Sequence, residues 1–131
     1  MTVMTAGGVQ AYVEKAQQYM AERRAHRDRV RNLRFDTIAV HGMYSAEEAF
    51  SGGQGGIIEP IFPSTSQAYR DSDEMEAALS YQIPTWCYSR IANPSTYYYE
   101  WTLALLEGYG FDGETSCCST SSGMAAIMTA V

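Results

Sequence analysis

The chain has 131 residues, of which 46% are hydrophobic and 18% charged, and its formal net charge is −6. This composition is typical of a globular protein with at most one domain, and it excludes disordered and fibrous chains. No apolar run approaches the roughly 20 residues that cross a bilayer, and the start lacks the basic-then-apolar order of a signal peptide, so we expect a cytoplasmic protein without membrane contact.

Residues 1–34 predict a basic amphipathic helical arm. Between Val9 and Leu33 apolar side chains recur at helical spacing, and a cluster of arginines follows toward the C-terminal end, where cations suit the helix dipole. These 34 residues carry seven of the nine basic residues and three acids, a balance of +4, which leaves −10 for residues 35–131. No aromatic stacking pattern accompanies the arginines, so we expect the arm to dock on an acidic surface of its own oligomer rather than on nucleic acid.

Cysteine and histidine content gives no sign of a metal site. The three cysteines, Cys87, Cys117 and Cys118, are odd in number and lack C-x-x-C spacing, which predicts reduced thiols rather than a disulfide framework or a zinc site. His26 and His41 have no neighbours that complete a ligand set or a Cys/His nucleophile pair. We therefore expect no metal.

The segment after Phe35 loses helical periodicity. Residues 51–70, "SGGQGGIIEPIFPSTSQAYR", are rich in Gly, Ser and Pro, which predicts an extended path. The glycines lack the preceding strand and following Lys-Ser/Thr of a phosphate loop, so a flexible loop is favoured. A helix is predicted from Asp71 to Tyr81, where Asp71 and Glu74 have capping-box spacing and an apolar face is expected from Met75, Ala78 and Leu79.

A clearer helix is predicted after "CYSRIANPST", residues 87–96. Asn93 suits the N-cap, Pro94 suits the first helical position, and Gly108 ends the pattern. The predicted packed face contains Tyr98, Trp101 and Leu105, widened by Leu103 and Leu106. Just before this helix, Tyr88 and Arg90 can both donate hydrogen bonds to an anion, which predicts a positioned phosphate contact.

The last segment predicts a second anion site. "TSCCS", residues 115–119, has the character of a buried strand, and a helix follows from the Ser-Gly pair. Backbone amides of Gly123 and Met124, with the hydroxyls of Ser121 and Ser122, would favour a phosphate. A plain strand-to-helix connection fits the spacing equally well. Because a parallel sheet needs several covered strands, we expect the core to be completed by further sequence.

Three ordered motifs carry a family resemblance: "YSRIANPST", "LEGYG" and "SSGMAAI". Together with the upstream "IIEPIFPSTSQAY", residues from about Phe35 to Val131 resemble the Cys/Met-metabolism family of pyridoxal 5'-phosphate (PLP) enzymes, which includes cystathionine γ-synthase and γ-lyase, methionine γ-lyase and O-acetylhomoserine sulfhydrylase. The resemblance implies an α/β fold in which residues 1–34 are the arm, 35–93 an extended segment with the Y-S-R phosphate motif, and 94–131 the beginning of a fold-type I PLP-binding large domain.

The resemblance also implies roles for both anion sites. Tyr88 and Arg90 would reach across a subunit interface to the phosphate of the neighbouring subunit's PLP. Gly123 and Met124 would hold the phosphate of their own subunit's PLP through backbone amides, with Ser122 adjoining. These contacts imply a homodimer or homotetramer.

The family's catalytic groups have no counterpart here. Its lysine that bonds to PLP, the acid at the pyridine nitrogen and the stacked aromatic ring all follow the S-G-M turn, and the chain's single lysine, Lys15, lies in the arm. We therefore expect the N-terminal part of an enzyme of methionine, cysteine or transsulfuration metabolism, a lyase or transferase that performs γ-elimination or γ-replacement on cystathionine, methionine or an O-acylhomoserine. Two alternatives stay open: a non-catalytic chain that pairs with a partner subunit or is a remnant, and an unrelated phosphate- or nucleotide-binding segment.

Overall fold

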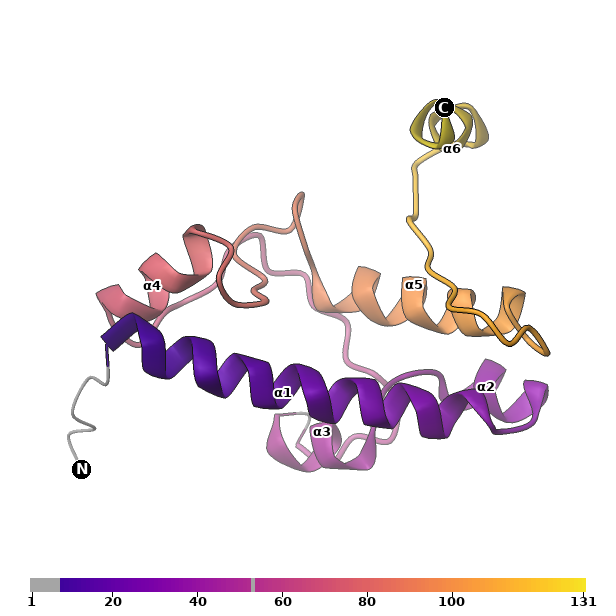
Figure 1. The fold of residues 1–131 in the computed structure, drawn as a ribbon, viewed down its shortest axis with the longest axis horizontal. Coiled ribbons are helices and arrows are strands. Elements are labelled where there is room, and N and C mark those ends of the chain that lie inside the picture. Colours follow the sequence, from indigo (N-terminus) through magenta and orange to yellow (C-terminus); the bar gives the residue numbers. More distant parts are fainter. Residues whose placement is uncertain (1–7, 53) are drawn as a thin grey trace. The chain divides into compact units, whose positions relative to one another are not determined.

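A computed structural model of the chain describes residues 8–52 and 54–131. Within them the chain forms α-helices joined by turns and extended segments, with no strand and one isolated antiparallel bridge between Ser66 and Tyr88. The helices, coloured along the sequence in Figure 1, are α1 (Gly8–Arg31), α2 (Phe35–His41), α3 (Ala46–Ser51), α4 (Ser72–Leu79), α5 (Pro94–Glu107) and α6 (Gly123–Ala130). None of the helices so described is long and apolar enough to cross a membrane.

Two compact units divide the chain. The first contains the described residues up to Asp28 together with Phe62–Pro94, and the second contains Arg29–Ile61 together with Ser95–Val131. The observed architecture is thus mostly helical, and the α/β sheet of a fold-type I domain is not among the described elements. Each unit has its own packing.

Helix α1 confirms the predicted arm helix. The apolar positions expected on one face are all half-buried, whereas Glu14, Lys15, Gln17 and Gln18 are exposed; the half-buried set is Val9, Tyr12, Val13, Ala16 and Met20. Residues with high helix propensity fill the polar face. Arg29 and Arg31 occupy the last turn, where their positive charges interact favourably with the helix dipole. Arg23 is buried, although it lies on the part of α1 that belongs to the first unit. Its Nη1 donates a hydrogen bond to Tyr19 Oη at 2.9 Å.

Helix α4 is shorter than predicted and packs by a different face. Asp71 caps it through a hydrogen bond from Glu74 N to Asp71 Oδ1 (2.9 Å), as the spacing predicts. The buried residues are Ala77 and Ala78, both with no exposed surface, while Met75 and Leu79 are 43% and 57% exposed. Of the three residues predicted to form an apolar face, Ala78 is therefore buried while Met75 and Leu79 remain largely exposed.

The core of the second unit is built on α5. This helix begins at Pro94 and ends before Gly108, as predicted, and Tyr98 and Leu105 are buried from it. Val30, Ile38 and Met43 complete the buried cluster, against which four partly buried side chains pack: Tyr44, Tyr97, Trp101 and Leu106. The rings of Tyr44 and Tyr98 meet edge to face with centroids 5.7 Å apart, a favourable aromatic geometry.

Two short helices lie where the sequence predicted only an extended path. Helix α2 supplies Ile38, 1% exposed, to the core. Helix α3 begins with a full capping box: Glu48 N donates to Ser45 Oγ (3.2 Å) and Ser45 N donates to Glu48 Oε2 (3.0 Å). Helices of six or seven residues are marginal alone, so caps and tertiary burial decide that they form. Describing residues 35–93 as an extended segment therefore misses both helices.

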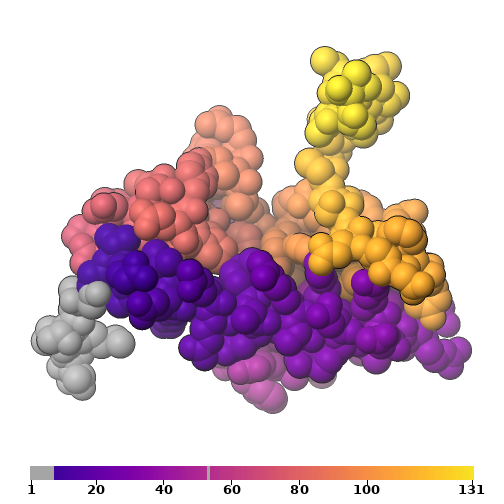
Figure 2. Space-filling view, in the orientation of Figure 1, coloured from indigo at the N-terminus to yellow at the C-terminus, as the bar shows by residue number. Residues whose placement is uncertain are grey.

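The predicted buried strand at residues 115–119 is also wrong. Those residues are half-buried or exposed and pair with no other strand in the part of the chain that the structure describes. Thr115 Oγ1 donates to Ala104 O (2.9 Å) and Ser119 N donates to Glu100 Oε1 (2.7 Å), so the segment is fastened to α5 instead. The helix predicted to follow is confirmed as α6, whose residues are not buried; on the face drawn in Figure 2 its yellow atoms are uncovered.

Candidate functional site

The Y-S-R motif forms a turn that is fixed to an upstream segment. Tyr88 bridges Ser66, Ser89 N donates to Thr65 O at 2.9 Å, and Ala92 N donates to Tyr88 O at 3.0 Å, which closes the turn. The bridge and the Ser89 bond are main-chain contacts with the segment that precedes α4, so the position of that segment sets the position of the turn.

Side chains strengthen the same attachment. Gln67 Oε1 accepts two hydrogen bonds, from Thr85 Oγ1 (2.9 Å) and from Trp86 N (3.0 Å). Asn93 Nδ2 donates to Phe62 O at 2.9 Å, at the start of α5. The segment between α4 and α5 is therefore held on both sides of the Y-S-R motif, and Figure 2 shows that segment at the surface of the first unit.

Tyr88 and Arg90 lie together and are open to solvent. The guanidinium carbon of Arg90 is 5.0 Å from the ring centroid of Tyr88, a cation–π distance. Arg90 is exposed and Tyr88 is 41% exposed. Among residues 8–52 and 54–131, neither the hydroxyl nor the guanidinium has a hydrogen-bond or ion-pair partner. A cation and a phenol donor are thus presented side by side, which fits an anion.

The second predicted site lies at the start of α6. Ser122 is the N-cap, and its Oγ accepts from Ala125 N at 3.2 Å while its hydroxyl hydrogen stays available for donation. Gly123 and Met124 follow, and within the described part of the chain their amide groups have no acceptor. A Cβ added at Gly123 would meet nothing within 4 Å, so the backbone there is open. Open amides at a helix N-terminus favour a phosphate.

The structure therefore divides the five predicted site residues into two groups. Tyr88 and Arg90 are neighbours in the first unit, and Ser122, Gly123 and Met124 are neighbours in the second. Each group matches the chemistry of a phosphate dianion: a charge-assisted donor with a phenol in one case, and backbone amides with a hydroxyl in the other.

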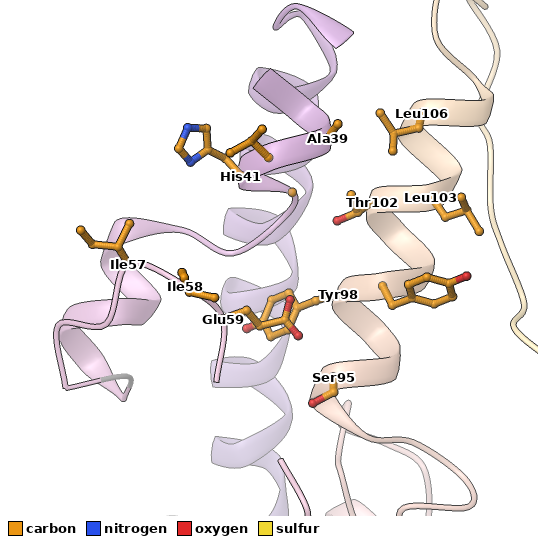
Figure 3. Close-up of a pocket in the computed structure, with 13 residues that line it drawn as sticks. Ala39, His41, Ile57, Ile58, Glu59, Ser95, Tyr98, Thr102, Leu103 and Leu106 are labelled. Atoms are coloured by element: carbon orange, nitrogen blue, oxygen red, sulfur yellow. The ribbon is translucent and has the colours of Figure 1, made fainter. Parts of the chain in front are cut away.

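Sequence reasoning missed a cavity of about 400 Å³ in the second unit. It lies between the end of α2, the segment 57–59 and α5, and Figure 3 shows Ile57, Ile58 and Glu59 on one side with Thr102 and Leu106 on the other. Burial, and then the charge of Glu48, raise the pKa of the Glu59 carboxyl. The available sequence signal was a pair of isoleucines beside an acid in a Gly-rich segment, which is too common a pattern to predict a cavity.

No group of three or more His, Cys, Asp or Glu side chains that could hold a metal ion occurs in the described ranges. The cysteines are free; Cys87 and Cys117 are half-buried and Cys118 is exposed. Burial and the nearby Glu100 carboxylate raise the pKa of the Cys117 thiol. A raised thiol pKa lowers the thiolate fraction, which is the opposite of what a nucleophilic cysteine needs.

Comparison with known proteins places most of the chain in one family. The family described as Cys/Met metabolism PLP-dependent enzyme matches residues 36–131, which include Tyr88, Arg90 and the start of α6 and exclude α1. The chain belongs to this family, whose cofactor is pyridoxal 5'-phosphate. The resemblance drawn from the three motifs is thereby confirmed.

Individual relatives agree with this assignment. The chain is 33% identical over 97 residues to a homocysteine/cysteine synthase of Kluyveromyces lactis, covering 74% of this chain and 20% of that protein. It is 31% identical over 97 residues to an O-succinylhomoserine sulfhydrylase of Pseudomonas aeruginosa (74% and 22%), and 30% identical over 102 residues to a homocysteine synthase of Schizosaccharomyces pombe (78% and 22%). The chain spans about a fifth of the length of these relatives. No solved structure gives a significant match.

Proposed function

We propose that these residues form the N-terminal part of a PLP-dependent enzyme of sulfur amino-acid metabolism, a lyase or transferase that carries out γ-elimination or γ-replacement. Cystathionine, methionine or an O-acylhomoserine would be the substrate. The observation that carries the proposal is the exposed Tyr88–Arg90 pair, whose donors are open in a chain that belongs to a PLP-dependent family. The names of the relatives, two synthases and a sulfhydrylase, support a sulfur-containing amino acid as substrate or product.

In this proposal Tyr88 and Arg90 bind the phosphate of the cofactor held by a neighbouring subunit. Arg90 offers a planar fork of N–H donors and a permanent charge, and Tyr88 adds an O–H donor beside it. The turn that carries both is fixed by main-chain contacts with residues 65 and 66, so little backbone freedom is lost when the phosphate binds. The active unit is then a homodimer or homotetramer.

At the same time Ser122, Gly123 and Met124 bind the phosphate of the cofactor in their own subunit. The two amides point out of the first turn of α6, and the helix dipole favours the negative charge there. Ser122 caps the helix and can donate its hydroxyl hydrogen to the same oxygen atoms. Two subunits thus contribute to each phosphate site, and the large domain that begins at residue 94 would have the fold-type I architecture.

When bound, PLP supplies the electron sink that stabilises negative charge next to the substrate amine. The residues present here anchor and orient it, and none is assigned a catalytic role. Lys15 is exposed on α1, outside the matched residues, so the lysine that the chemistry requires would come from other sequence. The position of Lys15 also supports the alternative of a non-catalytic chain that pairs with a partner subunit.

An Arg90→Ala substitution tests the phosphate role. We expect the natively purified protein to bind PLP about tenfold more weakly, because a hydrogen bond from a charged donor is lost. Arg24→Ala is the matched control, since Arg24 is an exposed arginine of α1 outside the family match. Equal PLP affinity in the Arg90→Ala and unmodified proteins, with helix content preserved by circular dichroism, would refute the role of Arg90.

A second measurement separates the enzyme from the non-catalytic chain. The denatured mass of every chain in the native preparation is recorded together with its visible absorption spectrum. A lysine-bearing chain with a borohydride-sensitive visible band supports the enzyme. A single 14.5 kDa species without colour supports the non-catalytic alternative.

A further inference from the structure

Helix α1 lies outside the family match, yet it makes a specific contact with the matched residues. Tyr12 Oη donates a hydrogen bond of 2.6 Å to Asp71 Oδ2, 59 residues further along the chain. Both residues belong to the first unit, and Figure 1 shows the start of α1 beside α4. The family match begins at residue 36, so this contact joins a residue outside the match to one within it.

Asp71 is an organising residue of α4. Its second oxygen, Oδ1, accepts from Glu74 N and caps the helix. The Glu74 carboxylate in turn accepts from Arg70 N at 2.6 Å, so the chain is fixed immediately before the helix as well. One carboxylate oxygen of Asp71 thus caps the start of α4, and the other joins Asp71 to α1.

The chain that leads into Asp71 is the segment that holds the Y-S-R turn. Thr65, Ser66 and Gln67 contact the turn through the Ser89 amide, the Tyr88 bridge and the two bonds to Gln67 Oε1. Only three residues lie between Gln67 and Asp71. A displacement of Asp71 would therefore move residues 65–67, and these residues are hydrogen-bonded to the segment that carries Tyr88 and Arg90.

We infer that Tyr12 is a positioning residue for the phosphate-binding turn: by holding Asp71, it fixes the segment that orients Tyr88 and Arg90. That Tyr12 strengthens phosphate binding rests on the proposed function. That Tyr12 fixes the position of the turn rests on the hydrogen bonds alone. The consequence is that the arm, which lies outside the family match, pre-organises the turn that carries Tyr88 and Arg90 and so strengthens phosphate binding.

The protonation of the pair supports a persistent contact. The hydrogen bond with Asp71 raises the pKa of Tyr12 to about 12, so the phenol stays a donor through the neutral range. The same bond lowers the pKa of the Asp71 carboxyl, which stays an acceptor. Glu74 and Arg70 are the other charged groups that act on Tyr12, the first raising and the second lowering its pKa.

Two variants break the contact while preserving the helices. Tyr12→Phe removes only the hydroxyl, and Asp71→Ser removes the acceptor but keeps a good N-cap for Glu74 N. Tyr19→Phe is the matched control, since it also removes one tyrosine hydroxyl from α1. The Tyr19 hydroxyl accepts a hydrogen bond from Arg23 in the same helix and not from α4. For each variant we would measure amide hydrogen exchange at Ser89 and Ala92 and the PLP affinity of the native protein. A double variant combines Arg90→Ala with Tyr12→Phe.

We expect Tyr12→Phe and Asp71→Ser each to accelerate exchange at Ser89 and Ala92, and to weaken PLP binding by roughly threefold or more, while Tyr19→Phe does neither. In the Arg90→Ala background, Tyr12→Phe should cause a smaller loss of PLP affinity than in the unmodified protein, because Tyr12 acts through the turn and only the Tyr88 contact is left to disturb. Unchanged exchange in Tyr12→Phe, or an additive loss in the double variant, would overturn the inference. An Arg90→Ala protein with full PLP affinity would instead overturn the proposed function, and the exchange rates would still decide the structural part.

Discussion

Truncating Ile38 tests whether α2, a helix not predicted from the sequence, contributes to the hydrophobic core of the second unit. Its side chain is 1% exposed and belongs to the cluster with Met43, Tyr98 and Leu105. Ile38→Ala removes three carbons, worth about 2.4 kcal/mol at about 0.8 kcal/mol each, and the cavity left behind brings the expected cost to about 3 kcal/mol. That is a large part of the roughly 5–15 kcal/mol by which a domain is stable.

Val40→Ala is the control in the same helix. Val40 is 77% exposed, so its truncation should change the free energy of unfolding by about 0.5 kcal/mol or less. Both substitutions replace a β-branched residue with alanine and raise helix propensity alike, so the difference between them reports burial. Urea unfolding followed by far-ultraviolet circular dichroism gives both values. Equal costs for the two variants would show that α2 does not bury Ile38, and the described core would then be incorrect.

Two further predictions concern pH and a glycine. Folding raises the pKa of Tyr12 from 10 to about 12, so the stabilisation from the Tyr12–Asp71 pair should be complete below pH 10 and should disappear as the pH rises to about 12. Folding lowers the pKa of Asp71, so at the acid end the same stabilisation should be lost as the pH falls below 3.8 and through the lowered pKa of Asp71. Denaturation midpoints of the wild type and Tyr12→Phe should therefore converge at both extremes, and a constant difference would contradict this coupling. Gly42→Ala should destabilise by about 1–3 kcal/mol, because φ is +56° and the new Cβ would lie 2.6 Å from Thr102 Oγ1. A Gly42→Ala protein with the wild-type midpoint in urea would contradict the close approach of α2 and α5.

Local signals in the sequence were sufficient for several elements. The arm helix follows from a long apolar repeat, and the start of α5 follows from Pro94, whose ring fits only the first helical turn. Ser122 before Gly123 correctly marked the start of α6. The Tyr88–Arg90 pair was visible for the same reason, since both residues lie within one short continuous stretch of sequence.

Tertiary structure decided what the local pattern could not. Helices α2 and α3 are too short to carry a repeat, and they form because Ile38 is buried and Ser45 and Glu48 cap each other. Thr115–Ser119 has strand composition, but a strand needs a pairing partner, and this segment is fastened to α5 instead. The Tyr12–Asp71 bond joins residues 59 positions apart, and no local pattern encodes such a pair.

The sequence by itself thus determined the long helices, their caps and the family motifs, because those depend on residues within a few positions of one another. The folded chain alone decided which apolar residues are buried and how the arm is attached to the start of α4. Those features depend on contacts between distant segments, whose energies appear only when the segments meet.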